Sequence, residues 1–286
     1  MTAARPFAAG SPINTPISAT PSIDEASEAM VAYAAREGRA YVNLYRFGVP
    51  IYLADPDDPA YAVSCSREGD WGPCPLGGSE RRIPDGATPS PGSDGALVVI
   101  QPDGSIDEYW QARRDGDGWK ASWGAVNPLE GSGWGGGSTG AGVSRLAGVV
   151  RVDEIRDGVI EHALVMQSDN VCADVVRPPA LKTDGDSTRR DCIPEGARLQ
   201  LDPTLDLDTL EGLQPAERAV ARALQVYGAY LVDRAGTSLS VSFETAPDAT
   251  TRSPGAVYRA AGLTHDYYAM SHIPWERLRV LSRWDG

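Results

Sequence analysis

The sequence predicts a mainly β protein, an antiparallel β-sandwich of jelly-roll type with two or three peripheral helices. Two observations lead to this class. Most apolar residues occur in short runs separated by turn residues, and helical periodicity is convincing in only two segments. Strands that do not alternate regularly with helices favour antiparallel sheets, which stack as sandwiches. Because the chain has no internal repeat and no clean linker, we expect an extended segment over residues 1–21 and a single β-rich domain over residues 22–286.

The two helical segments carry start signals. Ser22 followed by Glu25 has the spacing of a capping box and predicts a helix over residues 23–37. A proline at a first-turn position and one apolar face predict a second helix over residues 215–227. A single helical turn is expected at residues 152–156.

Most of the remaining chain is predicted to form strands. Residues 96–101 and 106–113 flank Pro102-Asp-Gly104, which is a hairpin signal, and a second turn returns the chain into a strand over residues 119–125. Further strands are expected at residues 41–45, 49–53, 159–166, 197–202, 229–234, 238–243 and 277–281.

Four cysteines occur as two close pairs, Cys65 with Cys74 and Cys172 with Cys192. Neither pair has the spacing of a zinc site, and the three histidines stand at no matching offset. Two local disulfides are therefore expected, each contributing about 3 kcal/mol in an oxidising compartment. We predict a secreted, extracellular protein that uses no metal and no cofactor.

Charge and hydropathy exclude several classes of partner. The 26 basic and 39 acidic residues give a formal charge of −13, which repels nucleic acid and anionic membranes. No apolar run approaches the roughly 18 residues that a membrane helix requires. Seven tryptophans and eleven tyrosines accompany only three phenylalanines. Rings that combine a flat apolar face with a polar edge are suited to stacking on sugars.

Alternation along the predicted strands selects the candidate carboxyl groups. Glu108 shares a strand face with Trp110, whose indole would raise the pKa of the carboxyl toward that of a general acid. Asp202 is the first candidate for the ionised carboxyl group that would act together with Glu108, because Arg198 and Gln200 share its face and could keep it ionised while binding sugar hydroxyls. Asp233 is the reserve candidate for the same role. If two such carboxyl groups cleave a glycosidic bond, a separation of about 5 to 5.5 Å would imply that the anomeric configuration is retained, and about 6.5 to 9.5 Å that it is inverted.

Other residues support alternative mechanisms. His162 shares a predicted strand face with apolar residues, so it is either a buried core histidine or a general base. Lys182 lies in the loop that the second disulfide would close, where it could contact a ligand. Tyr230 is a further candidate base. The glycine-rich tract 131–142 contains chance matches to nucleotide-binding and nucleophile-elbow motifs but lacks their strand-turn-helix setting, so we expect a surface loop.

Six segments of the sequence together carry a resemblance to known proteins. They are Trp110-Gln-Ala112, Ala121-Ser-Trp-Gly-Ala125, His162-Ala-Leu164, Lys182-Thr-Asp-Gly185, Pro194-Glu-Gly-Ala-Arg-Leu-Gln-Leu-Asp-Pro203 and Ala223-Leu-Gln-Val-Tyr-Gly-Ala-Tyr-Leu-Val-Asp233. These segments resemble a family of secreted bacterial proteins that is frequent in actinobacteria, and the likeness extends from about residue 12 onward. The resemblance implies export and a single β-rich domain, and it implies no catalytic residue.

Taken together, these features predict a carbohydrate-active protein, with a polysaccharide-cleaving glycoside hydrolase as the first hypothesis. A polysaccharide lyase is the second, in which Arg198 and Gln200 neutralise a uronate while His162 or Tyr230 removes the proton. The third is a non-catalytic sugar-binding or envelope protein. Its mark would be exposed tryptophan rings without a convergent pair of acids.

Overall fold

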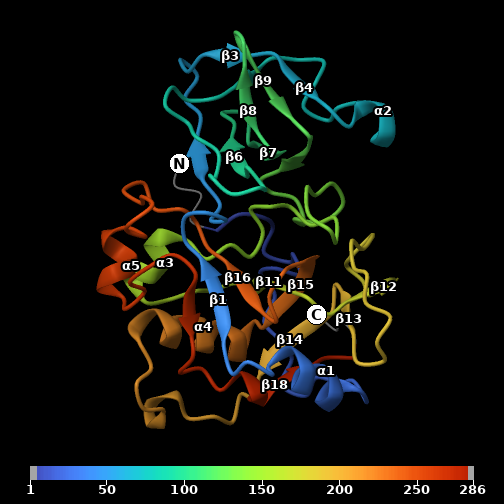
Figure 1. Cartoon of the computed structure of the whole chain (residues 1–286), viewed down its shortest axis with the longest axis vertical. Helices are drawn as coiled ribbons and strands as arrows, with labels where there is room; N and C mark the ends of the chain where they lie inside the picture. Colours follow the sequence, from blue (N-terminus) through green and yellow to red (C-terminus); the bar gives the residue numbers. More distant parts are fainter. Residues whose placement is uncertain (1–4, 283–286) are drawn as a thin grey trace.

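The computed structural model of the chain describes residues 5–282 (Figure 1). Residues 1–4 of the expected extended segment and residues 283–286 of the expected domain lie outside the described residues. Strands hold 29% of the residues and helices 15%, so the predicted mainly β class is confirmed.

The largest sheet has seven strands and mixed pairing. In spatial order these are β17 (Tyr268–Met270), β1 (Ala40–Asn43), β16 (Ser240–Ser242), β11 (Leu164–Ser168), β15 (Ala229–Arg234), β14 (Arg198–Leu201) and β18 (Leu278–Val280). Strand β1 is parallel to β16, and β11 is parallel to β15, while the other neighbours are antiparallel. The two parallel pairs depart from the expected antiparallel sheets, because long connections return the chain to this sheet in the same direction.

The second sheet contains the predicted hairpin. Its order is β10 (Trp123–Pro128), β7 (Ser105–Trp110), β6 (Leu97–Ile100) and β2 (Ile51–Leu53). Strands β6 and β7 are antiparallel, as expected, and Gly104 in their turn has a φ of 83°, which favours glycine.

Small sheets complete the β structure. A three-stranded sheet joins β4 (Val63–Cys65), β9 (Gly118–Ala121) and β8 (Arg113–Asp115). Two-stranded sheets pair β3 (Ala60–Tyr61) with β5 (Arg81–Arg82), and β12 (Val171–Val176) with β13 (Ile193–Glu195). The strand expected at residues 119–125 is thus divided between β9 and β10, with Ser122 between them. These pairings establish several mixed sheets and form no closed barrel among the described residues.

Two hydrophobic cores lie on either side of the central strands. On β15, Ala229 and Leu231 belong to the first core, and Tyr230 and Val232 belong to the second. The first core packs the helices against the large sheet, and the second joins that sheet to β6 and β7. A third core lies inside the four-stranded sheet and its neighbours.

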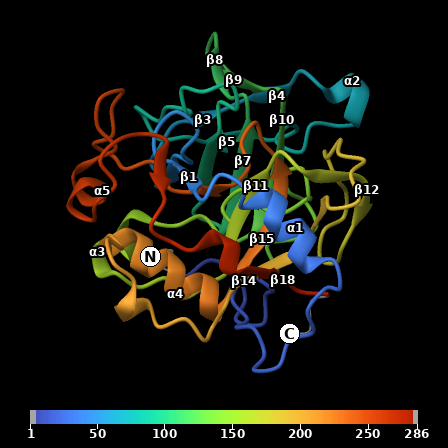
Figure 2. The same ribbon diagram turned by 60° about the horizontal axis from the view of Figure 1, so that its bottom comes forward.

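Five α-helices are described: α1 (Ser27–Ala34), α2 (Glu68–Trp71), α3 (Val152–Asp157), α4 (Pro215–Val226) and α5 (Ala256–Ala260). Two 3-10 turns, η1 (Leu207–Thr209) and η2 (Trp275–Arg277), complete the helical segments. Helices α3, α4 and α5 gather on one side of the molecule, while β12 and the short α2 lie toward the other side (Figures 1 and 2).

The helix predictions had different outcomes. Helix α4 and the short α3 occur where expected, and Glu217 completes a capping box with Gln214. Helix α1 is shorter than the segment expected at residues 23–37, and its predicted capping box is not formed. Ile23 instead makes an antiparallel bridge to Leu281, so pairing with the C-terminal strand replaced the first helical turn.

The described part of the N-terminal segment covers one face of the large sheet. Phe7 and Ile13 are buried in the second core, and the Ile17 amide donates to the Val226 carbonyl oxygen at 2.9 Å. This cover lies over the polar face of β14, because the Arg198 side chain donates to the Thr15 carbonyl oxygen. The polar row of β14 is therefore enclosed by the chain itself.

Candidate functional site

Glu108 is completely buried in β7 and accepts hydrogen bonds on both carboxyl oxygens. The donors are the Asn127 amide at 3.0 Å, the Ser144 hydroxyl, the Ser138 amide at 3.4 Å and hydroxyl at 3.1 Å, and the Arg145 amide at 2.9 Å. Burial raises the pKa of Glu108 although these donors act in the opposite direction. The side chain thus fastens residues 138–145 to β7, and its surroundings are these donors rather than an open face beside Trp110.

Asp202 lies just after β14 and forms an ion pair with Arg277. The hydroxyl and backbone N–H of Thr204, together with Arg277, lower the pKa of Asp202 to about 2. Glu108 lies in the second sheet, whereas Asp202 follows a strand of the large sheet. The side-chain hydrogen bonds of Glu108 and Asp202 go to different described residues.

The residues of the lyase hypothesis are buried, and their side chains contact other parts of the chain. Arg198 donates to the Tyr227 carbonyl oxygen at 2.8 Å and lies over the ring of Tyr230, which is fully buried. Gln200 donates to the Gln225 carbonyl oxygen at 2.7 Å.

His162 is 6% exposed and lies before β11 rather than within a strand. Its Nε2 lies 3.0 Å from a carboxylate oxygen of Glu154, and its Nδ1 lies 2.9 Å from the Ala163 carbonyl oxygen. This is the environment of a satisfied core histidine.

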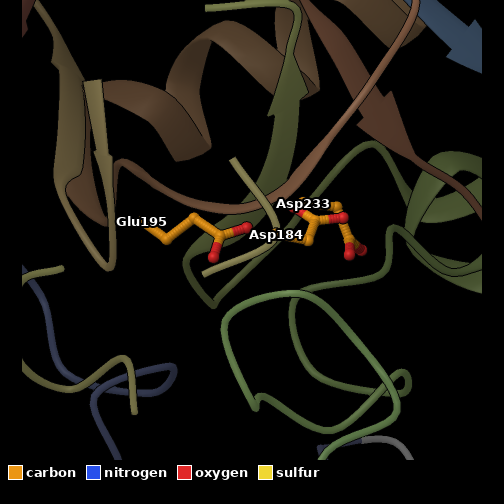
Figure 3. A group of neighbouring side chains, drawn as sticks. All are labelled: Asp184, Glu195 and Asp233. Carbon is orange, nitrogen blue, oxygen red and sulfur yellow. The ribbon is translucent and has the colours of Figure 1, made fainter. Parts of the chain in front are cut away.

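The reserve residue Asp233 belongs to a group that the structure assembles. Asp184, Glu195 and Asp233, here called the acidic cluster, each offer a carboxylate oxygen within 4.8 Å of the others. Figure 3 shows the Glu195 carboxylate pointing toward the other two side chains. Asp184 comes from the loop closed by the second disulfide, Glu195 from the end of β13, and Asp233 from β15.

The electrostatics of the acidic cluster are unusual. Burial, followed by the negative charges of Asp184 and Asp233, raises the pKa of Glu195 to about 9. Burial also raises the pKa of Asp233 to about 7, against the lowering influence of Arg145. Like charges held together at a site with little water disfavour the ionised forms. The cluster therefore holds protons at neutral pH unless a positive charge joins it.

The glycine-rich tract packs onto this cluster. The Gly140 amide donates to Asp233, and the Lys182 ammonium donates to the Thr139 carbonyl oxygen at 2.8 Å. Residues 139–142 are buried, so this part of the tract is not the surface loop that the composition predicted, although residues 132, 135 and 136 are exposed. The anchoring of the tract by Glu108 explains why it is packed.

Trp110 belongs to a second assembly, here called the tryptophan cluster: Trp71, Trp110 and Trp123. Trp71 stacks on Trp110 with ring centroids 6.1 Å apart and meets Trp123 edge to face at 5.5 Å. Trp71 is 53% exposed and lies in α2, which contains no buried residue.

Both predicted disulfides are confirmed, with Cys65 joined to Cys74 and Cys172 joined to Cys192. The first closes the loop that carries Trp71, and the second closes the loop that carries Lys182 and Asp184. Disulfides are typical of oxidising compartments, so the pairing is consistent with an extracellular protein.

Sequence reasoning missed Glu195 and Trp71. Glu195 stands in an apolar context, Ile193-Pro-Glu-Gly-Ala197, which signals a buried carboxyl group. Trp71 is the one tryptophan between the first pair of cysteines, and large aromatic residues in short closed loops commonly face solvent or a ligand.

No protein-family model, no curated protein and no solved structure matches the chain. The resemblance to secreted actinobacterial proteins therefore stays a prediction. Within residues 5–282, none of the helices has the length and apolar character needed to cross a bilayer.

Proposed function

We propose that this chain is an extracellular carbohydrate-binding protein and that the tryptophan cluster binds the sugar rings. One observation carries the proposal: Trp71 is 53% exposed in a four-residue helix that buries no side chain. The helix adds nothing to a core, yet it holds a large apolar ring in solvent. Exposed apolar surface maintained in this way is typical of a binding site.

The geometry of the cluster favours a rigid binding platform. Trp71 is held by the Cys65–Cys74 disulfide at the base of its loop and by ring contacts with Trp110 and Trp123. A ring that is already fixed loses little conformational freedom when a ligand covers it. The apolar face of a pyranose could therefore stack on Trp71 with little entropic opposition.

Polar groups around the rings match the hydroxyl groups of a sugar. Arg67 lies 5.5 Å from the centre of the Trp71 ring and pairs with Asp70 at 3.1 Å. The Ser122 hydroxyl donates to Gln111 at 2.6 Å beside the β7 end that carries Trp110. The formal charge of −13 favours neutral polysaccharides over polyanions.

The test is retention on a panel of neutral polysaccharides, namely cellulose, chitin, xylan, mannan and β-1,3-glucan. Covering about 80 Å² of indole at about 25 cal/mol per Å² contributes about 2 kcal/mol, so Trp71→Ala should weaken binding about 30-fold. Its far-ultraviolet circular dichroism should stay unchanged, because α2 buries no residue.

Tyr267→Ala is the matched control, since Tyr267 is an exposed aromatic residue, 40% accessible, on another element. It should bind as the wild type does. Absence of retention on every polysaccharide, or equal retention of wild type and Trp71→Ala, would refute the proposed function.

Glycoside hydrolysis is the second candidate, and the acidic cluster is the observation in its favour. Glu195 keeps its proton at neutral pH beside the exposed Asp184, a pairing that general acid catalysis uses. It ranks second because Glu195 is fully buried, which leaves no surface for a glycosidic oxygen. Release of reducing ends from the same panel by the wild type, and its loss in Asp184→Asn, would reverse this order.

A further inference from the structure

Glu195 presents a physical problem that the sugar-binding proposal does not address. The residue is completely buried, and neither of its carboxyl oxygens accepts a hydrogen bond from a described residue. The nearby Thr183 hydroxyl lowers the pKa of Glu195, but the acceptor of its hydrogen bond is the Cys172 carbonyl oxygen, at 3.1 Å. A buried carboxyl group without donors is among the least favourable arrangements in a folded protein, and native structures compensate for it.

The charges around Glu195 make the problem larger. The strongest charge effects on it come from Asp184 and Asp233, and both are negative. Nearby basic side chains have hydrogen-bond partners outside the cluster: Lys182 donates to the Thr139 carbonyl oxygen, and Arg234 pairs with Asp186. Arg145 lowers the pKa of Asp233, but its guanidinium donates to the Ser138 hydroxyl and carbonyl oxygens, and it is not among the strongest charge effects on Glu195. The missing compensation at this point is a positive charge.

We propose that Asp184, Glu195 and Asp233 bind one divalent cation of the hard, oxygen-preferring class, and that Ca²⁺ is the preferred ion. Two oxygens that are each 2.3 to 2.6 Å from one Ca²⁺ can be at most about 5 Å apart. The three carboxylates fulfil this condition, with ligand oxygens within 4.8 Å of one another. The all-oxygen ligand set excludes the nitrogen and sulfur sites that zinc prefers.

The backbone passes close to the acidic cluster at Gly140. A Cβ atom at Gly140 would lie 2.6 Å from Glu195 Oε1 and 2.7 Å from Asp184 Oδ1, so only glycine lets the chain pass this close. The Gly140 amide donates to Asp233, and the Arg234 amide donates to Asp184 at 2.9 Å. These two donors orient their carboxylates and use one acceptor position each, as supporting groups around metal ligands do.

A bound ion would also link segments that are distant in sequence. Asp184 belongs to the loop closed by Cys172 and Cys192, Glu195 follows that loop, and Asp233 lies on β15 beside the glycine-rich tract. The cation would therefore fasten the disulfide loop to the large sheet. The inference departs from the sequence-based expectation of a metal-free protein, which considered only cysteine and histidine spacing.

The experiment is calorimetric titration of the full chain with CaCl₂, MgCl₂ or MnCl₂ after dialysis against EDTA. The wild type should bind one Ca²⁺ per chain, and Ca²⁺ should raise its thermal midpoint. Asp184→Asn and Glu195→Gln should each weaken Ca²⁺ binding at least about tenfold. Asp186→Asn is the matched control, because Asp186 lies in the same loop but outside the cluster, and it should bind as the wild type does.

Asp184 is exposed, so its variant remains informative even if Glu195→Gln fails to fold. Two results would overturn the inference. One is the absence of binding of all three ions up to about 10 mM, beyond the weakest extracellular calcium sites. The other is unchanged Ca²⁺ affinity in Asp184→Asn, which would place the bound ion elsewhere and leave the acidic cluster as a set of carboxyl groups that share protons.

Discussion

Replacing Glu108 by glutamine tests whether this residue is an anchor or an acid. In the structure its carboxylate receives hydrogen bonds from Asn127, Ser138, Ser144 and Arg145, which together hold the glycine-rich tract against β7. Glutamine has almost the same shape but offers an NH₂ group in place of one oxygen. The variant therefore changes hydrogen bonding and charge and leaves packing volume intact.

The loss of stability in Glu108→Gln follows from the hydrogen-bond donors at each carboxyl oxygen of Glu108. Oε2 receives two backbone N–H groups, from Ser138 and Arg145, which cannot turn into acceptors, so the new NH₂ must take the place of Oε1. There Ser144 can rotate to accept, but the Asn127 amide loses its bond to Glu108, 3.0 Å away, and keeps only the Gly136 carbonyl oxygen as an acceptor. The variant loses one charge-assisted hydrogen bond, and its remaining hydrogen bonds are weakened to the strength of neutral ones. Together these changes lower the free energy of unfolding by about 3 kcal/mol.

For a chain of 286 residues, the unfolding entropy of roughly 2.1 cal/mol/K per residue converts this loss into a midpoint decrease of about 5 °C. Differential scanning calorimetry at pH 7 would measure it. Glu130→Gln is the matched control, since Glu130 is exposed just before the same tract and its substitution should leave the midpoint within about 1 °C. An unchanged midpoint for Glu108→Gln would refute the reasoning and show that Glu108 is already protonated in the folded chain.

Three further predictions concern the other candidate residues. Gly140→Ala should lower the free energy of unfolding by about 1 to 3 kcal/mol in urea titrations, because its Cβ would overlap two carboxyl oxygens. Gly236→Ala is the control: the space around Gly236 is open, so the free energy of unfolding should hardly change. Asp202→Asn should lower the same free energy by less than about 1 kcal/mol, as expected for a partly exposed ion pair, and a larger loss would contradict this assignment. In EDTA, the free energy of unfolding of the wild type should fall relative to that of Glu195→Gln as pH rises from about 5 to 9, by up to about 1.4 kcal/mol per pH unit. The reason is that the folded protein retains a proton on Glu195 with a pKa of about 9, whereas the unfolded chain releases this proton near the ordinary value of 4.5. Urea midpoints that rise over this range relative to the variant would contradict the prediction.

Local signals in the sequence were sufficient for individual elements. The turn at Gly104, the proline at the start of α4 and the spacing of the cysteine pairs each depend on neighbours within a few positions, and each led to a correct prediction. Helix α1 shows the opposite case. Its capping signal lost to a bridge between Ile23 and Leu281, residues at opposite ends of the chain.

The candidate sites depend on contacts that no local pattern contains. Strand alternation correctly separated Leu199 from Arg198, but it gave no sign that the N-terminal segment would cover the polar face. Alternation likewise placed Glu108 beside Trp110 on one face, while most of its donors come from residues 138–145, some 30 positions away. The acidic cluster combines residues from a loop, the end of β13 and β15; the apolar neighbours of Glu195 signal its burial, but no local pattern shows that Asp184 and Asp233 lie beside it.

The parallel pairing of β1 with β16 has a consequence for how the chain is made. Tyr41 pairs with Ser240, so at about 5 to 20 residues per second a ribosome needs roughly 10 to 40 s after finishing β1 before its partner exists. The other neighbour of β1, the strand β17, is completed later still. Sheets that depend on such distant pairing form slowly, because loop closure must precede the contacts that stabilise them. The large sheet therefore cannot be completed until synthesis is nearly finished, whereas the four strands of the second sheet, all within residues 51–128, are available much earlier.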